Sequence, residues 1–211
     1  MGKRKILIIG ATGRTGRLVL DRALEEGDTV TVLARRPDAL ADVKDRITVV
    51  AGDATSREDA AKAMRGQEPV IAALGTGGSL RANGLFTLAS EAVAGAAREA
   101  GVSRLVWLSS FGVGETFRDA SFLQKMIYGT LLRDLYKNKE ASERIIRDSG
   151  LDWTIVYPTG LTNGPATGCY RAGERIRMAG FPRISRADVA DFLYKAVRDD
   201  AWIRRNAVIT Y

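Results

Sequence analysis

Histidine is absent from the sequence, and cysteine occurs once, at Cys169. Without histidine the chain lacks the side chain that most often serves as a general acid or base and as a metal ligand. A cysteine–histidine nucleophile is therefore excluded, and we expect no metal site. A single cysteine also cannot form a disulfide within the chain. Any proton transfer must use lysine, tyrosine, serine, a carboxylate or water.

Long apolar runs are missing too. A membrane-spanning helix needs about 20 consecutive apolar residues, and no run in the chain approaches that length. The basic stretch Lys3–Lys5 leads directly into Ile6–Ile9, which is too short for the apolar part of a signal peptide. We therefore expect a cytoplasmic protein that does not associate with a membrane.

The chain carries a net charge of +7. Its lysines and arginines are dispersed, and no aromatic residues alternate with them as they do in single-strand-binding proteins. We interpret the charge as a solvated basic surface that favours an anionic small molecule, and we expect no nucleic-acid partner.

Apolar strand-like runs alternate with segments of helical period. At 211 residues with 45% hydrophobic residues, the chain suits one domain. Helices are predicted over 85–100, 122–147 and 188–198, with a shorter one near 56–65. The alternation predicts an α/β fold, a Rossmann-type doubly wound and mostly parallel sheet in a single domain over residues 1–211. Its strands are expected at 6–9, 29–34, 47–51, 70–74, 104–108, 153–157 and 207–210.

A glycine-spaced turn follows the first strand. Gly10 permits a tight turn, Gly13 lets the backbone approach a pyrophosphate, and Gly16 lets the next helix pack close to the sheet. The free N–H groups at the start of that helix then face the anion. This pattern predicts a dinucleotide site whose first contacts come from Gly10, Thr12, Gly13, Arg14, Thr15 and Gly16.

The spacing G-A-T-G-x-T-G resembles the extended and atypical branches of the short-chain dehydrogenase/reductase superfamily. Later segments look like the NAD(P)H-binding reductases typified by biliverdin-IXβ reductase/flavin reductase, over about residues 3–211. The resemblance implies a nicotinamide cofactor and a small-molecule substrate. The segments that carry it are VLARRPD, GDAT, ALGTGG, LVWLSS and SGLDWTIVYPTGLTNGP.

Arg35 and Arg36 follow the second strand, where an NAD-selective site would place an acid. A guanidinium there can hold a 2′-phosphate, so we predict NADP(H) as the preferred cofactor with NAD(H) possible. The alternative is that both arginines only solvate a strand end. The resemblance further implies that Asp53 and Ala54 lie against the adenine, although Asp53 could equally cap the helix near 56–65. It also implies that Gly75 and Thr76 border the ribose and nicotinamide.

The catalytic candidates are Ser109, Ser110 and Lys139. The resemblance places Ser110 beside nicotinamide and substrate; a turn cap is the alternative. Tyr136 stands one residue later than the superfamily tyrosine, which turns it about 100° around its helix. We therefore expect the proton to come from solvent or through Ser110.

The loop Pro158–Thr159–Gly160 matches the superfamily segment that covers the nicotinamide. Gly160 stands where the resembling reductases carry a histidine. The irregular segment 158–182 is the predicted cover of the substrate.

These features favour an NADPH-dependent oxidoreductase that transfers hydride to a flat conjugated acceptor, such as a flavin, a quinone or a linear tetrapyrrole. Two other classes stay open. One is a non-enzymatic NADP(H)-binding redox sensor of the NmrA-like kind, and the other is an isomerase or epimerase of a tailoring pathway. We expect a monomer or a small homo-oligomer.

Overall fold

The computed structural model describes residues 2–211, apart from the side chain of Leu123. Its strands are β1 (Lys5–Ile9), β2 (Thr29–Ala34), β3 (Ile47–Ala51), β4 (Pro69–Ala72), β5 (Arg104–Leu108), β6 (Asp152–Pro158), β7 (Gly160–Thr162), β8 (Arg171–Gly173), β9 (Arg183–Ser185) and β10 (Arg205–Thr210). Its helices are α1 (Arg14–Glu25), α2 (Arg57–Met64), α3 (Leu85–Ala100), α4 (Phe122–Gly129), α5 (Arg133–Arg147) and α6 (Arg186–Ala196), with short 3-10 helices at Pro37–Arg46, Gly114–Asp119 and Asp200–Trp202.

The main sheet has the order β3-β2-β1-β4-β5-β6-β10-β8 within residues 2–211. All neighbouring strands run parallel except β8, which pairs antiparallel with β10 at the edge. The order reverses between β1 and β4. In a doubly wound sheet the ligand crevice opens at this reversal, beyond the carboxyl ends of the strands. The α/β Rossmann-type fold with a mostly parallel sheet is therefore confirmed.

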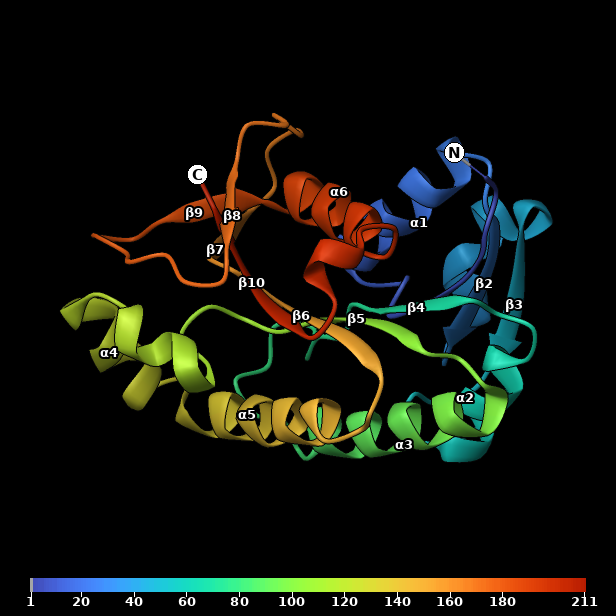
Figure 1. Cartoon of the computed structure of the whole chain (residues 1–211), viewed down its shortest axis with the longest axis horizontal. Helices are drawn as coiled ribbons and strands as arrows, with labels where there is room; N and C mark the ends of the chain where they lie inside the picture. Colours follow the sequence, from blue (N-terminus) through green and yellow to red (C-terminus); the bar gives the residue numbers. More distant parts are fainter. Residues whose placement is uncertain (1) are drawn as a thin grey trace.

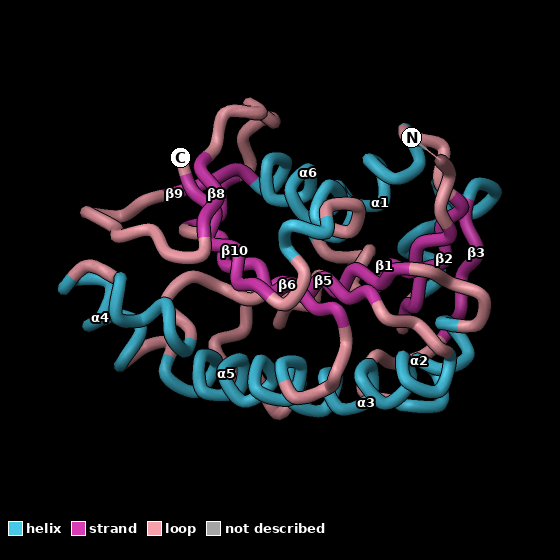
Figure 2. The backbone as a smooth tube through the Cα atoms, in the orientation of Figure 1, coloured by secondary structure: helices cyan, strands magenta, loops and turns pink. Residues whose placement is uncertain are grey.

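Helices cover both faces of the sheet. Helices α2, α3 and α5 lie in a row along one face, and α1 and α6 lie along the other (Figures 1 and 2). The side chains of β1 alternate between the two resulting cores, with Ile6 and Ile8 in one and Leu7 and Ile9 in the other. A strand buried on both faces needs a continuous apolar run, which explains why β1 could be recognised in the sequence.

The predicted helix over 122–147 is interrupted in the structure. Helix α4 ends at Gly129, and Thr130 takes the non-helical angles φ −113° and ψ −80°. The hydroxyl of Thr130 donates to the carbonyl of Met126 at 2.7 Å. Glycine has a low helix propensity, and a threonine hydroxyl competes for backbone carbonyls, so the chain breaks here and restarts as α5.

The segment 158–182 is more ordered than its glycine and proline content predicts. It contains β7, which pairs with β9, and β8, which extends the main sheet. Arg175 forms an ion pair at 2.8 Å with Asp119, the last residue of the 3-10 helix over Gly114–Asp119. The segment therefore joins the edge of the sheet. Among residues 2–211, no helix is both long and apolar enough to cross a membrane.

Candidate functional site

A cleft of about 1080 Å³ lies at the carboxyl edge of the sheet. Its walls come from the turns after β1, β2, β3, β4 and β5. Further side chains reach it from α3, α5, β7 and α6. The cleft therefore occupies the position where strand order reverses, as expected for a dinucleotide site.

The glycine turn after β1 requires glycine for three different reasons. Gly10 has φ +90°, and a Cβ there would lie 2.5 Å from the carbonyl oxygen of Ala73. A Cβ on Gly16 would lie 2.1 Å from the carbonyl oxygen of Gly10, so Gly16 permits the close approach of α1. A Cβ on Gly13 would meet only that same oxygen, at 3.2 Å, and Gly13 lines the cleft. Gly16 is therefore needed for the packing of α1 against the turn, whereas Gly13 lies on the side of the turn that lines the cleft.

The start of α1 has free anion-binding capacity. Gly13 occupies the N-cap position of α1, and no side chain there accepts a hydrogen bond from the first amides of the helix. The first turn of α1 contains no acidic residue. The amide groups at a helix start carry partial positive charge and bind phosphate well. Thr12, Arg14 and Thr15 line the cleft beside them. The residues present therefore fit the pyrophosphate of a nicotinamide dinucleotide.

The end of the cleft near β2 and β3 is lined by Arg35, Arg36, Asp53 and Ala54. A guanidinium nitrogen of Arg35 lies 4.0 Å from a carboxylate oxygen of Asp53. The backbone amide of Thr55 donates to that carboxylate and helps to lower the pKa of Asp53. The cap of α2 is Ser56, which accepts from the amide of Asp59, so the alternative role of Asp53 as helix cap was wrong. Asp53 instead forms a turn on the cleft wall.

At the other end of the cleft, Lys139 of α5 meets the serines that follow β5. The Lys139 ammonium donates to the Ser110 hydroxyl at 2.7 Å and lies 4.8 Å above the ring of Phe86. Burial lowers the pKa of Lys139 to about 8, against the opposing charge of Glu143. An ammonium with this pKa can release a proton near neutral pH, and Lys139 and Ser110 both line the cleft.

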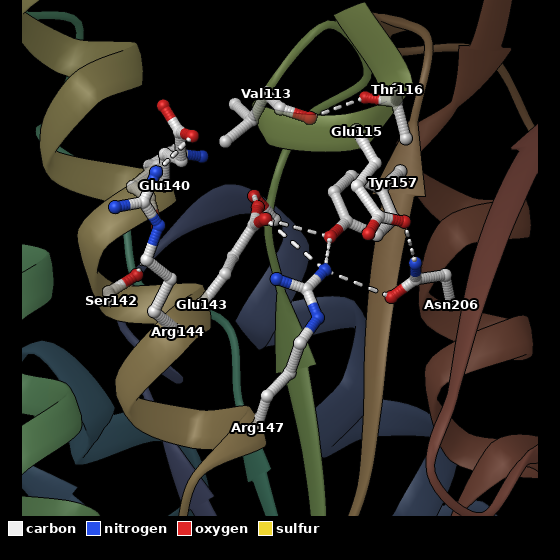
Figure 3. A network of polar contacts seen from close by, with 12 residues as sticks. Val113, Glu115, Thr116, Glu140, Ser142, Glu143, Arg144, Arg147, Tyr157 and Asn206 are labelled. Carbon is white, nitrogen blue, oxygen red and sulfur yellow. Dashed lines mark hydrogen bonds and ion pairs between the residues drawn. The ribbon is translucent and has the colours of Figure 1, made fainter.

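A buried carboxylate lies behind this pair. Glu143 accepts a hydrogen bond from Ser109 at 2.5 Å and another from the Tyr157 hydroxyl at 2.8 Å. Arg147 lies 3.5 Å from the same carboxylate and also donates to Tyr157 and to Asn206, as Figure 3 shows. Burial raises the pKa of Glu143 above its usual range. Glu143 thus fixes the rotamer of Ser109, a role that its position in the sequence did not reveal.

Tyr136 points away from the cleft. Its hydroxyl donates to the carbonyl of Phe111 at 3.2 Å, and its ring packs against Tyr128 with centroids 4.9 Å apart. Leu135, the preceding residue, lines the cleft instead. The one-residue offset in the sequence therefore corresponds to a different face of α5.

Pro158, Thr159 and Gly160 do not line the cleft in the described residues, contrary to the expected cofactor contact. The Thr159 hydroxyl donates to Thr210, and the Gly160 amide donates to the carbonyl of Pro182. Pairing with β9 and β10 turns these residues into the sheet, and Leu161 is the neighbour that reaches the cleft. Most of the segment 158–182 likewise lies outside the cleft wall. The glycine-rich loop over 75–83, which includes Gly75 and Thr76, contributes far more of that wall.

The cleft wall is strongly basic. Arg81 and Arg186, which were not assigned from the sequence, join Arg14, Arg35 and Arg36, whereas Asp53 is the only acidic residue among the described lining residues. Apolar side chains also line the cleft: the Phe86 ring lies beside the Lys139 ammonium, and the others are Leu85, Leu88, Leu135 and Leu161. Helical spacing from 85 could have indicated the apolar group, but no local pattern indicates Arg186.

Comparisons with known proteins agree with this geometry. The sequence profile described as NAD(P)H-binding matches residues 10–200. A (4-alkanoyl-5-oxo-2,5-dihydrofuran-3-yl)methyl phosphate reductase of Streptomyces griseus is 35% identical over 153 residues, which cover 72% of this chain and 46% of that protein. An uncharacterized sugar epimerase of Bacillus subtilis is 29% identical over 195 residues, covering 88% of this chain and 84% of that one.

Among solved structures, an anaerobillin reductase from Escherichia coli O157:H7 is similar, with a TM-score of 0.81 and 28% identity. The match covers 97% of this chain and 96% of that one. The match to the Streptomyces reductase spans just under half of that protein's length. The glycine turn, the strand order and the profile match together place this chain in the NAD(P)H-binding family.

Proposed function

We propose that the protein is an NADPH-dependent reductase that transfers hydride to a flat conjugated acceptor, such as a flavin, a quinone or a linear tetrapyrrole. The observation that carries the proposal is the cleft itself. It begins at a glycine turn flanked by arginines and ends at the Lys139–Ser110 hydrogen bond. Two relatives named as reductases, of a dihydrofuranone phosphate and of anaerobillin, support a reductase.

Each part of the cleft has a role in this proposal. Arg35 and Arg36 hold the 2′-phosphate of the cofactor, and Gly13 with the start of α1 holds the pyrophosphate. NADPH supplies the hydride when bound. Ser110 passes the proton of Lys139 to the reduced acceptor, and solvent later returns a proton to Lys139.

The apolar part of the cleft wall suits a flat acceptor. The Phe86 ring lies beside the Lys139 ammonium, and Leu88, Leu135 and Leu161 present further carbon surface to the cleft. Apolar walls hold a conjugated ring system without fixing its polar groups, and they exclude water from the reacting atoms. The protein therefore orients the reactants, while the cofactor carries the difficult chemistry.

Steady-state NADPH oxidation tests this function. Purified protein is mixed with NADPH and with FMN, a quinone, dichlorophenolindophenol or biliverdin as acceptor. Repeated turnover with at least one acceptor supports a reductase. Binding of NADPH without any turnover would favour the sensor, and conversion of a carbonyl substrate without net NADPH consumption would favour the epimerase.

Arg35→Ala should weaken NADPH binding and barely change NADH binding. Loss of a charge-assisted hydrogen bond to phosphate costs about 1.5 to 3 kcal/mol, so the Kd for NADPH should rise roughly tenfold or more. Isothermal titration calorimetry with both cofactors measures this. The matched control is Arg65→Ala, which removes one exposed charge outside the cleft. Equal affinity of the parent protein for both cofactors would show that the cleft does not select the 2′-phosphate.

Tyr136→Phe should keep most of the turnover. Its hydroxyl contacts the carbonyl of Phe111 outside the cleft, and burial raises the pKa of Tyr136. A tyrosine that acts as general acid contributes typically a factor of about 10² to 10⁴. A loss of that size, with unchanged cofactor affinity, would return the protein to the conventional tyrosine-dependent scheme.

A further inference from the structure

Arg186 enters the cleft from the far end of the chain. It is the first residue of α6, and Arg14 is the first residue of α1. The two helices pack against each other on the same face of the sheet (Figure 1). Both arginines line the cleft beside the glycine turn. The fold therefore presents two guanidinium groups near the place that fits a pyrophosphate.

These two guanidinium groups lack acidic partners. In the described part of the chain, neither forms an ion pair with a carboxylate. Arg186 is half-buried, and both its burial and the charge of Arg14 lower its pKa. Two like charges held close together in a partly desolvated site repel each other until an anion lies near both. A diphosphate is the anion that this cleft is shaped to hold.

A hydrogen bond fixes the orientation of Arg186. Its guanidinium donates to the side-chain oxygen of Asn163 at 2.7 Å. Asn163 directly follows β7, whose Leu161 lines the cleft. The loop beyond Asn163 is held by Asp188 of α6, which accepts from Thr167 and from the amide of Gly168. The first turn of α6 thus contacts both the cleft and the segment over 160–168.

We propose that Arg186, together with Arg14, binds the pyrophosphate of the dinucleotide, and that the Arg186–Asn163 hydrogen bond couples this binding to the order of the segment 160–168. The inference rests on the proposed cofactor site and adds a ligand from the carboxyl-terminal third of the chain. Its ligand class is the diphosphate that NADPH, NADH and ADP-ribose share. Arg186 therefore contributes affinity without selecting between the two cofactors.

Calorimetric titration separates this role from that of Arg35. Arg186→Ala should raise the Kd for NADPH, NADH and ADP-ribose by the same factor, roughly tenfold, as expected when a charged hydrogen bond is lost. The affinity for 2′-AMP, which has no pyrophosphate, should stay unchanged. Arg186→Lys should lower the affinity for the three ligands by an intermediate factor, because lysine keeps the positive charge but lacks the planar guanidinium with its paired N–H donors. Arg177→Ala removes an exposed charge from the same half of the chain outside the cleft and serves as control.

Hydrogen exchange tests the coupling. NADPH should slow amide exchange over 160–168 in the parent protein, and Asn163→Ala should remove most of that protection while the affinity falls only severalfold. Thermal melting of each variant shows whether it folds. Unchanged dinucleotide affinity in both Arg186 variants, or a loss confined to NADPH, would overturn the inference.

The binding measurements are independent of turnover. They keep their meaning if no acceptor is reduced, so failure of the reductase proposal can be told apart from failure of this inference. If the folded parent protein binds none of the three pyrophosphate ligands, NADPH, NADH and ADP-ribose, the cofactor site and the Arg186 inference are both wrong.

Discussion

Gly13→Val should abolish dinucleotide binding and leave a folded protein. Gly13 lines the cleft and has φ −85° and ψ 160°, angles that valine also adopts, and a Cβ there needs only a small shift from the carbonyl oxygen of Gly10 at 3.2 Å. The added side chain fills the space needed by the pyrophosphate. Steric overlap costs about 1 to 3 kcal/mol, and each lost hydrogen bond to a charged group costs about 1.5 to 3 kcal/mol. A loss of roughly hundredfold or more in NADPH affinity follows, measured by calorimetry.

Gly16→Ala is the matched control, because it changes the same turn from the other side. A Cβ on Gly16 would lie 2.1 Å from the carbonyl oxygen of Gly10, a backbone atom that cannot simply rotate away. This variant should lower the melting temperature, since α1 must move off the sheet to accept it. Gly13→Val should lower the melting temperature much less, because its Cβ would lie 3.2 Å from the same oxygen. Retained dinucleotide binding in Gly13→Val would mean that the turn has only a structural role.

Turnover should fall as the pH rises through about 8. Burial lowers the pKa of Lys139 to about 8, so its ammonium is protonated below that pH and loses the proton above it. If Lys139 supplies the proton through Ser110, the acid form must be present, and the rate should drop about tenfold per pH unit on the alkaline side. The pH dependence of kcat with saturating NADPH and acceptor measures this.

Lys139→Met tests the same assignment. The methionine side chain has a length similar to that of lysine and cannot donate a proton. We therefore expect kcat to fall by a factor of about 10² to 10⁴, and the decrease of kcat above pH 8 to disappear. Ser110→Ala should lose less, because water can replace its hydroxyl between Lys139 and the acceptor. The neighbour whose charge bears on this titration is Glu143 of the same helix, whose own pKa is raised by burial while the charge of Arg147 opposes that rise. A rate in the parent protein that stays constant through the alkaline range would exclude Lys139 as the acid.

The sequence was most informative where the structure depends on neighbours along the chain. The run from Ile6 to Ile9 predicted β1 because a strand buried on both faces must be apolar throughout. The helix over 85–100 has the bounds that its apolar period and Gly101 predicted. The offset of Tyr136 placed it on a different face of α5 because helical geometry fixes where each successive side chain points. In each case a few adjacent residues carry the whole signal.

Tertiary structure decided how distant segments meet. Arg186 reaches the cleft only because α6 packs beside α1, and the Lys139–Ser110 bond exists only because α5 lies against the end of β5. Pairing with β9 and β10 moved Pro158–Gly160 out of the cleft, against the expectation from the resemblance. The glycine turn and the type of each element were thus set by local chemistry. The sequence did not determine which partners the charged side chains find. Coulomb and hydrogen-bond energies depend on distances in space, and the spacing of residues along the chain does not specify those distances.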